Sequence, residues 1–124
     1  MVAKISSGSS LYSALAYNQQ KVNAGEAKVI FANNMVEPKD GNFSIGICTY
    51  SFEPYLLANK KTENPVIHIS LNPDPNDKLN DEPFAQIAEE YMQKLGYGNQ
   101  PFFVYKHEDI DRHHIHMPVI SSFI

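Results

Sequence analysis

Four of the five histidines in this sequence of 124 residues lie within ten positions: His107, His113, His114 and His116. Residues two apart on a β-strand point to the same face with Cα atoms about 6.5–7 Å apart, so His114 and His116 can converge on one ion while His113 points away. His107 can join them from the partner strand of a hairpin. Three imidazoles leave positions open for water and substrate oxygens, which is typical of a catalytic metal site. The spacing therefore predicts a three-histidine metal site at His107, His114 and His116.

Two carboxylates, Asp109 and Asp111, lie between these histidines in a charged turn. Each is near enough to accept the second ring N–H of a ligand histidine, which would fix the tautomer and raise the basicity of that ring. A surface hairpin can also carry histidines without function, but the third histidine and the two carboxylates favour the metal interpretation. Ligand chemistry favours Zn²⁺, Mn²⁺, Fe²⁺ or Ni²⁺ over Mg²⁺, because neutral imidazole is a softer ligand than carboxylate. The residues leave the choice of ion open.

Two tyrosines, Tyr12 and Tyr17, lie on the first predicted helix, residues 10–23. Ser9 or Ser10 can cap this helix, whose apolar stripe consists of Leu11, Leu15 and Val22. At 100° per residue Tyr17 falls on the polar side, while Tyr12 falls at the edge of the stripe. The two tyrosines therefore have different surroundings, and an exposed tyrosine of no function is one interpretation of Tyr17.

Apolar periodicity predicts the elements that must position these residues. Strands are expected at 1–6, 27–32, 66–71, 101–107 and 114–122, the last two as an antiparallel hairpin, and helices at 10–23, 52–60 and 82–95. Pro54 is expected in the first turn of the second helix, and residues 43–51 before it fit either a strand or a helix. Asp81 is expected to cap the third helix, and Gly96 and Gly98 are expected to end it. This order predicts an α+β fold in which helices pack on a central, mainly antiparallel sheet.

The composition limits the classes of function. The length fits one domain, and no stretch is apolar enough for a membrane span or for the core of a signal peptide, so a cytoplasmic location is expected. The single cysteine, Cys48, excludes an internal disulfide and a cysteine-based zinc site, and its apolar neighbours indicate a buried thiol. Lys and Arg number 10 against 14 Asp and Glu, and the resulting net charge of −4 opposes DNA binding that relies on phosphate charge alone.

Three segments together resemble one enzyme family. The histidine segment, residues 107–116, resembles the metal motif of conjugative relaxases, the plasmid and transposon mobilization nucleases of the HUH endonuclease superfamily. Within the helix 10–23, the run from Leu11 to Asn18 is similar to the relaxase segment that supplies a nucleophilic tyrosine. The strand and turn at 66–73 resemble the central strand of that family. The resemblance is closest to mobilization proteins of Bacteroides-type elements and covers nearly the whole chain.

The resemblance implies an HUH relaxase-like palm that nicks single-stranded DNA at an origin of transfer. The reaction would be a metal-dependent transesterification that leaves a 5′-phosphotyrosyl intermediate. Matching the motifs by position makes Tyr17 the nucleophile and Asp111 the catalytic carboxylate behind the metal ligands, with Asp109 as its rival. The same matching gives the metal ligands as His107, His114 and His116, and it gives His113 no role. The expected cofactor is a divalent ion, Mg²⁺ or Mn²⁺ first and Zn²⁺ second. The expected partners are the DNA and accessory mobilization proteins, with no membrane.

Other residues and functions stay open as alternatives. His68 shares a strand face with Ser70 and is expected either to be a structural, hydrogen-bonded histidine or to line the site. Positive side chains that could contact phosphates, or lie on an ordinary solvated surface, are Lys60, Lys61, Lys106 and Arg112. The β-prone end at 119–124 leads us to expect that 1–124 is the N-terminal part of a longer relaxase, whose other segments help to hold DNA.

Two other functions fit the same residues. One is a noncatalytic DNA- or protein-binding fragment of the same fold. The other is a metal-dependent phosphohydrolase. Among phosphohydrolases, the histidine-triad nucleotide hydrolases would need a third histidine at position 118, where this sequence has Pro118.

Overall fold

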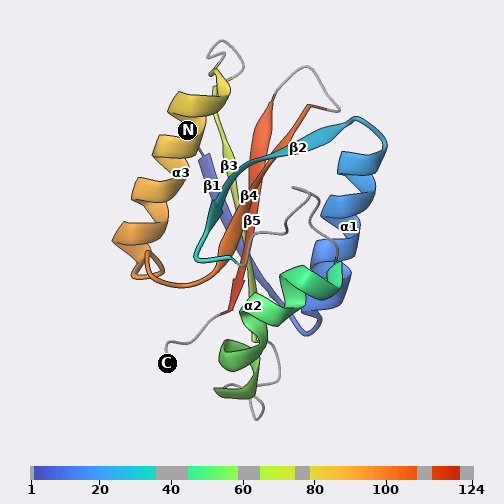
Figure 1. Cartoon of the computed structure of the whole chain (residues 1–124). Helices are drawn as coiled ribbons and strands as arrows, with labels where there is room; N and C mark the ends of the chain where they lie inside the picture. The colour runs from blue at the N-terminus through green and yellow to red at the C-terminus, as the bar shows by residue number, and fades with distance from the viewer. Residues whose placement is uncertain (1, 36–44, 59–64, 75–78, 109–112, 121–124) are drawn as a thin grey trace.

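The computed structural model describes residues 2–35, 45–58, 65–74, 79–108 and 113–120, with only the backbone of 45–50 (Figure 1). Its strands are β1 (Val2–Gly8), β2 (Ala27–Asn33), β3 (Val66–Asn72), β4 (Phe102–His107) and β5 (His114–Ile120). Its helices are α1 (Leu11–Asn23), α2 (Ile45–Ala58) and α3 (Asp81–Leu95). Within these ranges no helix has the length and apolar character needed to cross a membrane.

The strands form a single five-stranded sheet in the order β1-β3-β5-β4-β2, and every neighbouring pair is antiparallel. This confirms the predicted α+β fold and the predicted hairpin of β4 and β5. In that hairpin His107 lies opposite His114, and Tyr105 lies opposite His116. Directly opposite residues project to the same face of a sheet, and so do residues two apart on one strand, such as Tyr105 and His107. The register therefore places all three histidines on one face.

Helices cover both faces of the sheet, with α3 on one side and α1 and α2 on the other (Figure 1). The six residues of β4 are all buried, and they divide between these two sides by alternation. Phe102 and Val104 belong to the core cluster under α3, whereas Phe103 and Tyr105 belong to the cluster under α1 and α2. The same alternation turns His107 toward α1.

The segment that the sequence left undecided, residues 43–51, is helical from Ile45 onward. Pro54 therefore lies inside α2, and the expectation that it occupies the first turn is wrong. A short apolar run fits a strand or one side of a buried helix equally well, so packing decides between them. Phe52 of α2 is fully buried, and it packs in one core cluster with residues of α1 and of the sheet. The side chain of Cys48, expected to be buried, lies outside the described residues.

The first turn of α3 differs from the prediction. The helix begins at Asp81 itself, so Asn80 is the N-cap, and the expectation that Asp81 caps the helix is wrong. The Asp81 carboxylate instead forms ion pairs with Lys28 Nζ at 2.7 Å and with Lys106 Nζ at 2.8 Å. These tertiary ion pairs replace the local capping bond that the sequence pattern had suggested.

Two other helix ends follow the sequence as predicted. The Ser10 hydroxyl accepts the Ser13 backbone N–H at 3.1 Å and so caps the start of α1. Gly96 ends α3 with a φ of 92°, a left-handed conformation that glycine adopts without strain. These local signals set the start of α1 and the end of α3.

Candidate active site

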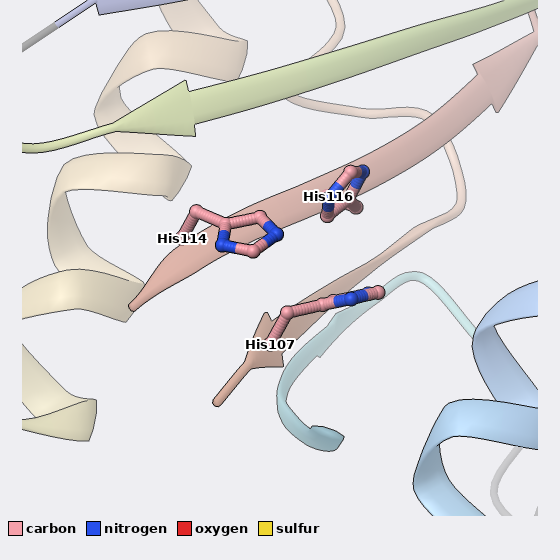
Figure 2. A group of neighbouring side chains, drawn as sticks. All are labelled: His107, His114 and His116. Atoms are coloured by element: carbon pink, nitrogen blue, oxygen red, sulfur yellow. The ribbon is translucent and has the colours of Figure 1, made fainter. Parts of the chain in front are cut away.

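Three histidine rings meet where β4 ends and β5 begins (Figure 2). Measured between ring centroids, His107 lies 4.2 Å from His116 and 5.2 Å from His114, and the last two rings are 5.0 Å apart. His107 is buried, and the other two are half-buried. The structure thus brings together the three histidines that the sequence predicted to converge, while their role as ligands stays a prediction.

The cluster fits a divalent ion. One ring nitrogen from each histidine can be chosen so that the three atoms lie within 4.8 Å of one another. Nitrogens bound to one ion at about 2.1 Å lie roughly 3–3.5 Å apart, so the three rings would have to move closer together to hold an ion. Neutral imidazole suits Zn²⁺, Fe²⁺ and Ni²⁺ in particular, whereas Mg²⁺ and Mn²⁺ prefer oxygen ligands. Because His114 and His116 are half-buried, one side of the cluster is accessible to solvent and to substrate oxygens.

Helix α1 reaches the cluster through Asn18, a residue to which the sequence analysis gave no role. Asn18 Oδ1 lies 2.8 Å from His107 Nε2, and Asn18 Nδ2 donates to the Ala14 carbonyl at 2.8 Å. The side chain is buried, with only 4 % of the residue exposed. A signal for it was present, because Leu11, Ala14, Leu15 and Asn18 follow the i, i+3, i+4, i+7 spacing of a buried helix face. Asn18 is the polar member of that face.

Tyr17 lies beside the histidines. Its ring stacks on His107 with centroids 6.1 Å apart and planes inclined by 23°. The residue is 51 % exposed, as expected from its place on the polar side of α1, and Lys21 Nζ lies 5.9 Å from its ring centroid. Tyr12 was expected at the edge of the apolar stripe, but it is 65 % exposed, because the buried face of α1 is narrower than predicted. Of the two tyrosines, the structure brings Tyr17 to the histidines.

A cavity of about 670 Å³ opens next to the cluster, between α1 and the strands β1 and β3. Tyr17, Asn18 and His116 form part of its wall, which makes it continuous with the histidine site. Polar side chains elsewhere in the wall are Lys4, Ser6, Ser9, Ser10, Ser13, His68 and Ser70. Hydroxyls and one positive charge in such a wall can hydrogen-bond to sugar and phosphate oxygens.

His68 and Ser70 share the face of β3 that lines this cavity, as the alternation of the strand predicted. Among the described residues the His68 ring makes no hydrogen bond, so lining the site describes it better than a hydrogen-bonded structural role does. The ring packs so closely on Gly8 that a Cβ atom there would lie 2.8 Å from His68 Nε2. Burial lowers the pKa of His68, which keeps the ring uncharged at neutral pH.

Lys106 is buried on the opposite face of the sheet, and the expectation that it contacts phosphate or lies on a solvated surface is wrong. Alternation along β4 turns it toward α3, where its Nζ donates to Asp81 at 2.8 Å. Hydrogen bonds from Lys106 and Lys28 hold the pKa of Asp81 below its usual value. The hydrogen bond to Asp81 in turn raises the pKa of Lys28. This network fixes the end of β4 directly before His107.

Several predicted site residues lie outside the described residues: Lys60, Lys61, Asp109, Asp111 and Arg112. The catalytic carboxylate, Asp111 or Asp109, therefore stays a prediction. His113 is described, and it precedes β5 as a half-buried residue. We continue to assign it no role.

Comparison with known proteins identifies a family. Residues 17–122 match the family model of the relaxase nuclease domain of MobA/VirD2-like proteins. That match includes Tyr17 and all three clustered histidines. No curated protein and no solved structure shows a significant match to the chain.

Proposed function

Because the chain belongs to the MobA/VirD2-like relaxase nuclease family of the HUH superfamily, we propose that it nicks single-stranded DNA at an origin of transfer. The proposed nucleophile is the Tyr17 hydroxyl. The observation that carries the proposal is the stacking of Tyr17 on His107, one of three histidines whose ring nitrogens can share an ion. The expected likeness to Bacteroides-type mobilization proteins stays a prediction.

In the proposed reaction the Tyr17 oxygen attacks the scissile phosphorus and forms a phosphotyrosyl ester with the 5′ end of the downstream strand. The bond from phosphorus to the upstream O3′ breaks, and that oxygen takes up a proton and leaves as a hydroxyl. The phenolic proton passes to a nearby base. One phosphate ester replaces another, so the reaction needs no ATP and can run backward to rejoin the strand. The half-exposed position of Tyr17 gives its oxygen access to a DNA strand.

His107, His114 and His116 are proposed to hold the divalent ion, Mg²⁺ or Mn²⁺ first and Zn²⁺ second. When bound there, such an ion polarises the scissile phosphate and neutralises charge that develops in the transition state. We keep Asp111 as the proposed carboxylate behind the ligands, with Asp109 as the alternative.

The DNA strand is proposed to enter the cavity beside His116. Hydroxyl groups and Lys4 in the wall offer hydrogen bonds and a local positive charge to its phosphates. A local contact is required because the net charge of −4 gives little general attraction for DNA. Accessory mobilization proteins are the proposed source of additional affinity.

The test incubates the protein with Mn²⁺ or Mg²⁺ and labelled single-stranded oligonucleotides that cover the origin of transfer of the element encoding it. We expect a covalent adduct on a denaturing gel, and mass spectrometry should locate it in the peptide that contains Tyr17. Tyr17→Phe should abolish the adduct and retain metal binding. Tyr12→Phe, which changes an exposed tyrosine on the same helix, should leave the yield of adduct unchanged.

Other outcomes identify other functions. An adduct formed by Tyr17→Phe at the wild-type yield would refute the assignment of the nucleophile. Cleavage without an adduct, in both the wild type and Tyr17→Phe, would indicate a metal-dependent phosphohydrolase. Binding of DNA without cleavage or adduct would indicate a noncatalytic fragment of the same fold.

A further inference from the structure

Asn18 is a buried amide that contacts a proposed metal ligand from a different element. It lies on α1, whereas His107 lies at the end of β4, 89 residues away in the sequence. Both residues are almost completely buried, at 4 % and 1 % exposed. A hydrogen bond between two buried polar groups is costly to break, because neither partner can turn to water instead.

The second bond of Asn18 fixes which way its amide points. A backbone carbonyl can only accept, so the atom 2.8 Å from the Ala14 oxygen must be the amide nitrogen. The amide oxygen therefore faces His107, 2.8 Å from Nε2. An oxygen of this kind can only accept, so Nε2 must carry the proton. In a neutral imidazole the lone pair then resides on Nδ1.

We propose that Asn18 is a positioning residue that holds His107 as its Nε2–H tautomer, so that His107 offers Nδ1 to the ion. This inference rests on the proposed function, because the ion that His107 would bind is part of that proposal. It differs from the role expected for Asp111 in two respects: the acceptor is uncharged, and it comes from the helix that carries the nucleophile. A neutral acceptor orients the ring without adding a negative charge beside the ion.

The same contact ties the nucleophile to the metal site. Tyr17 and Asn18 are consecutive on α1, and both contact His107, one by ring stacking and one by a hydrogen bond. Rotation or sliding of α1 would break the buried hydrogen bond before it moved Tyr17 far from the histidines. Asn18 therefore sets the position of the helix as well as the tautomer of the ligand.

The experiment reads the tautomer directly. Protein labelled with ¹⁵N at histidine is examined without metal by long-range ¹H–¹⁵N correlation at about pH 8, above the ordinary histidine pKa of about 6.5. We expect the wild-type His107 signals to be those of the Nε2–H form. In Asn18→Leu, which keeps a similar volume without an acceptor, the signals should move to a mixture with the Nδ1–H form. Asn18→Asp retains an acceptor and should retain the Nε2–H form.

Calorimetric titration with Mn²⁺ measures the consequence for the ion. Loss of a group that orients a metal ligand typically weakens binding by about 10–100-fold, and we expect a loss of this size in Asn18→Leu. Gln20→Leu, an exposed substitution on the same helix, is the matched control and should bind Mn²⁺ like the wild type. Asn18→Asp should bind Mn²⁺ more tightly than Asn18→Leu does.

Two results would overturn the inference. One is a wild-type His107 in the Nδ1–H form, a measurement that needs no variant and so does not depend on whether Asn18→Leu folds. The other is a folded Asn18→Leu protein with unchanged tautomer and unchanged Mn²⁺ affinity. If the tautomer behaves as expected but no DNA adduct forms with any variant, the proposed function fails while the role of Asn18 stands.

Discussion

Removal of the Asp81 carboxylate should destabilise the protein by leaving a buried cation without its anion. The Lys106 side chain is 6 % exposed, and its ammonium group binds Asp81 Oδ1 at 2.8 Å and the Leu79 carbonyl at 3.3 Å. Removing one partner of a fully buried ion pair lowers the free energy of unfolding by about 3–5 kcal/mol. The Asp81 side chain is 45 % exposed and the Leu79 contact remains, so we expect about half of that cost, roughly 2 kcal/mol, for Asp81→Ala.

Thermal and urea denaturation of the variants measure this cost. A loss of about 2 kcal/mol corresponds to a fall in Tm of about 8 °C for a domain of this size. Glu82→Ala is the matched control, because it also removes a carboxylate from the first turn of α3, and it should cost about 0.3–1 kcal/mol. Lys106→Met removes the buried charge at similar volume. Asp81→Ala should therefore cost much less when it is made together with Lys106→Met.

The cost should also depend on pH. Hydrogen bonds from Lys106 and Lys28 lower the pKa of Asp81 in the folded state. The contribution of Asp81 is therefore complete above the ordinary carboxyl pKa of about 3.9 and is lost as the pH falls through the lower folded pKa. The difference in the free energy of unfolding between wild type and Asp81→Ala should therefore shrink as the pH falls from the ordinary carboxyl pKa through the lower folded pKa. Equal stability of the two at pH 7, or strict additivity with Lys106→Met, would refute the reasoning.

Two further predictions concern the site itself. The double variant His114→Ala, His116→Ala should lose the heat of Mn²⁺ binding in calorimetry, whereas His113→Ala should keep it; equal affinity in the double variant and the wild type would exclude the three-histidine site. Gly8→Ala places a Cβ atom 2.8 Å from His68 Nε2, and because this ring borders the cavity and can turn aside, the substitution should cost about 0.5–1.5 kcal/mol in urea denaturation. His68→Ala should relieve most of that cost, and a Gly8→Ala protein as stable as the wild type would contradict the close packing.

Local periodicity in the sequence determined much of the secondary structure and the faces on which the site residues lie. A strand alternates with period two, so the positions of His107, His114 and His116 already placed them on one face once β4 and β5 formed a hairpin. The helical period likewise placed Tyr17 on the exposed side of α1. Apart from the start of α2, the segments that became strands and helices were predicted with small errors at their ends. These features depend on residues close together in the chain.

The errors arose where local patterns were ambiguous. The run before Phe52 fits both periods, and packing against the sheet made it part of α2. Asp81 has the chemistry of a cap, but two lysines from other elements bind its carboxylate. Lys106 could be solvated on an isolated hairpin, but α3 covers it and supplies its partners.

Only the tertiary structure decided which distant residues share the site. β1 and β2 flank α1 in the sequence, but they lie at opposite edges of the sheet. The cavity combines residues from α1, β1, β3 and β5. The contact of Asn18 with His107 joins positions 89 residues apart, and no local period relates them. The sequence determined the residue types and the faces on which they lie, because neighbouring residues set backbone geometry; the packing of apolar faces against one sheet determined which of those residues meet.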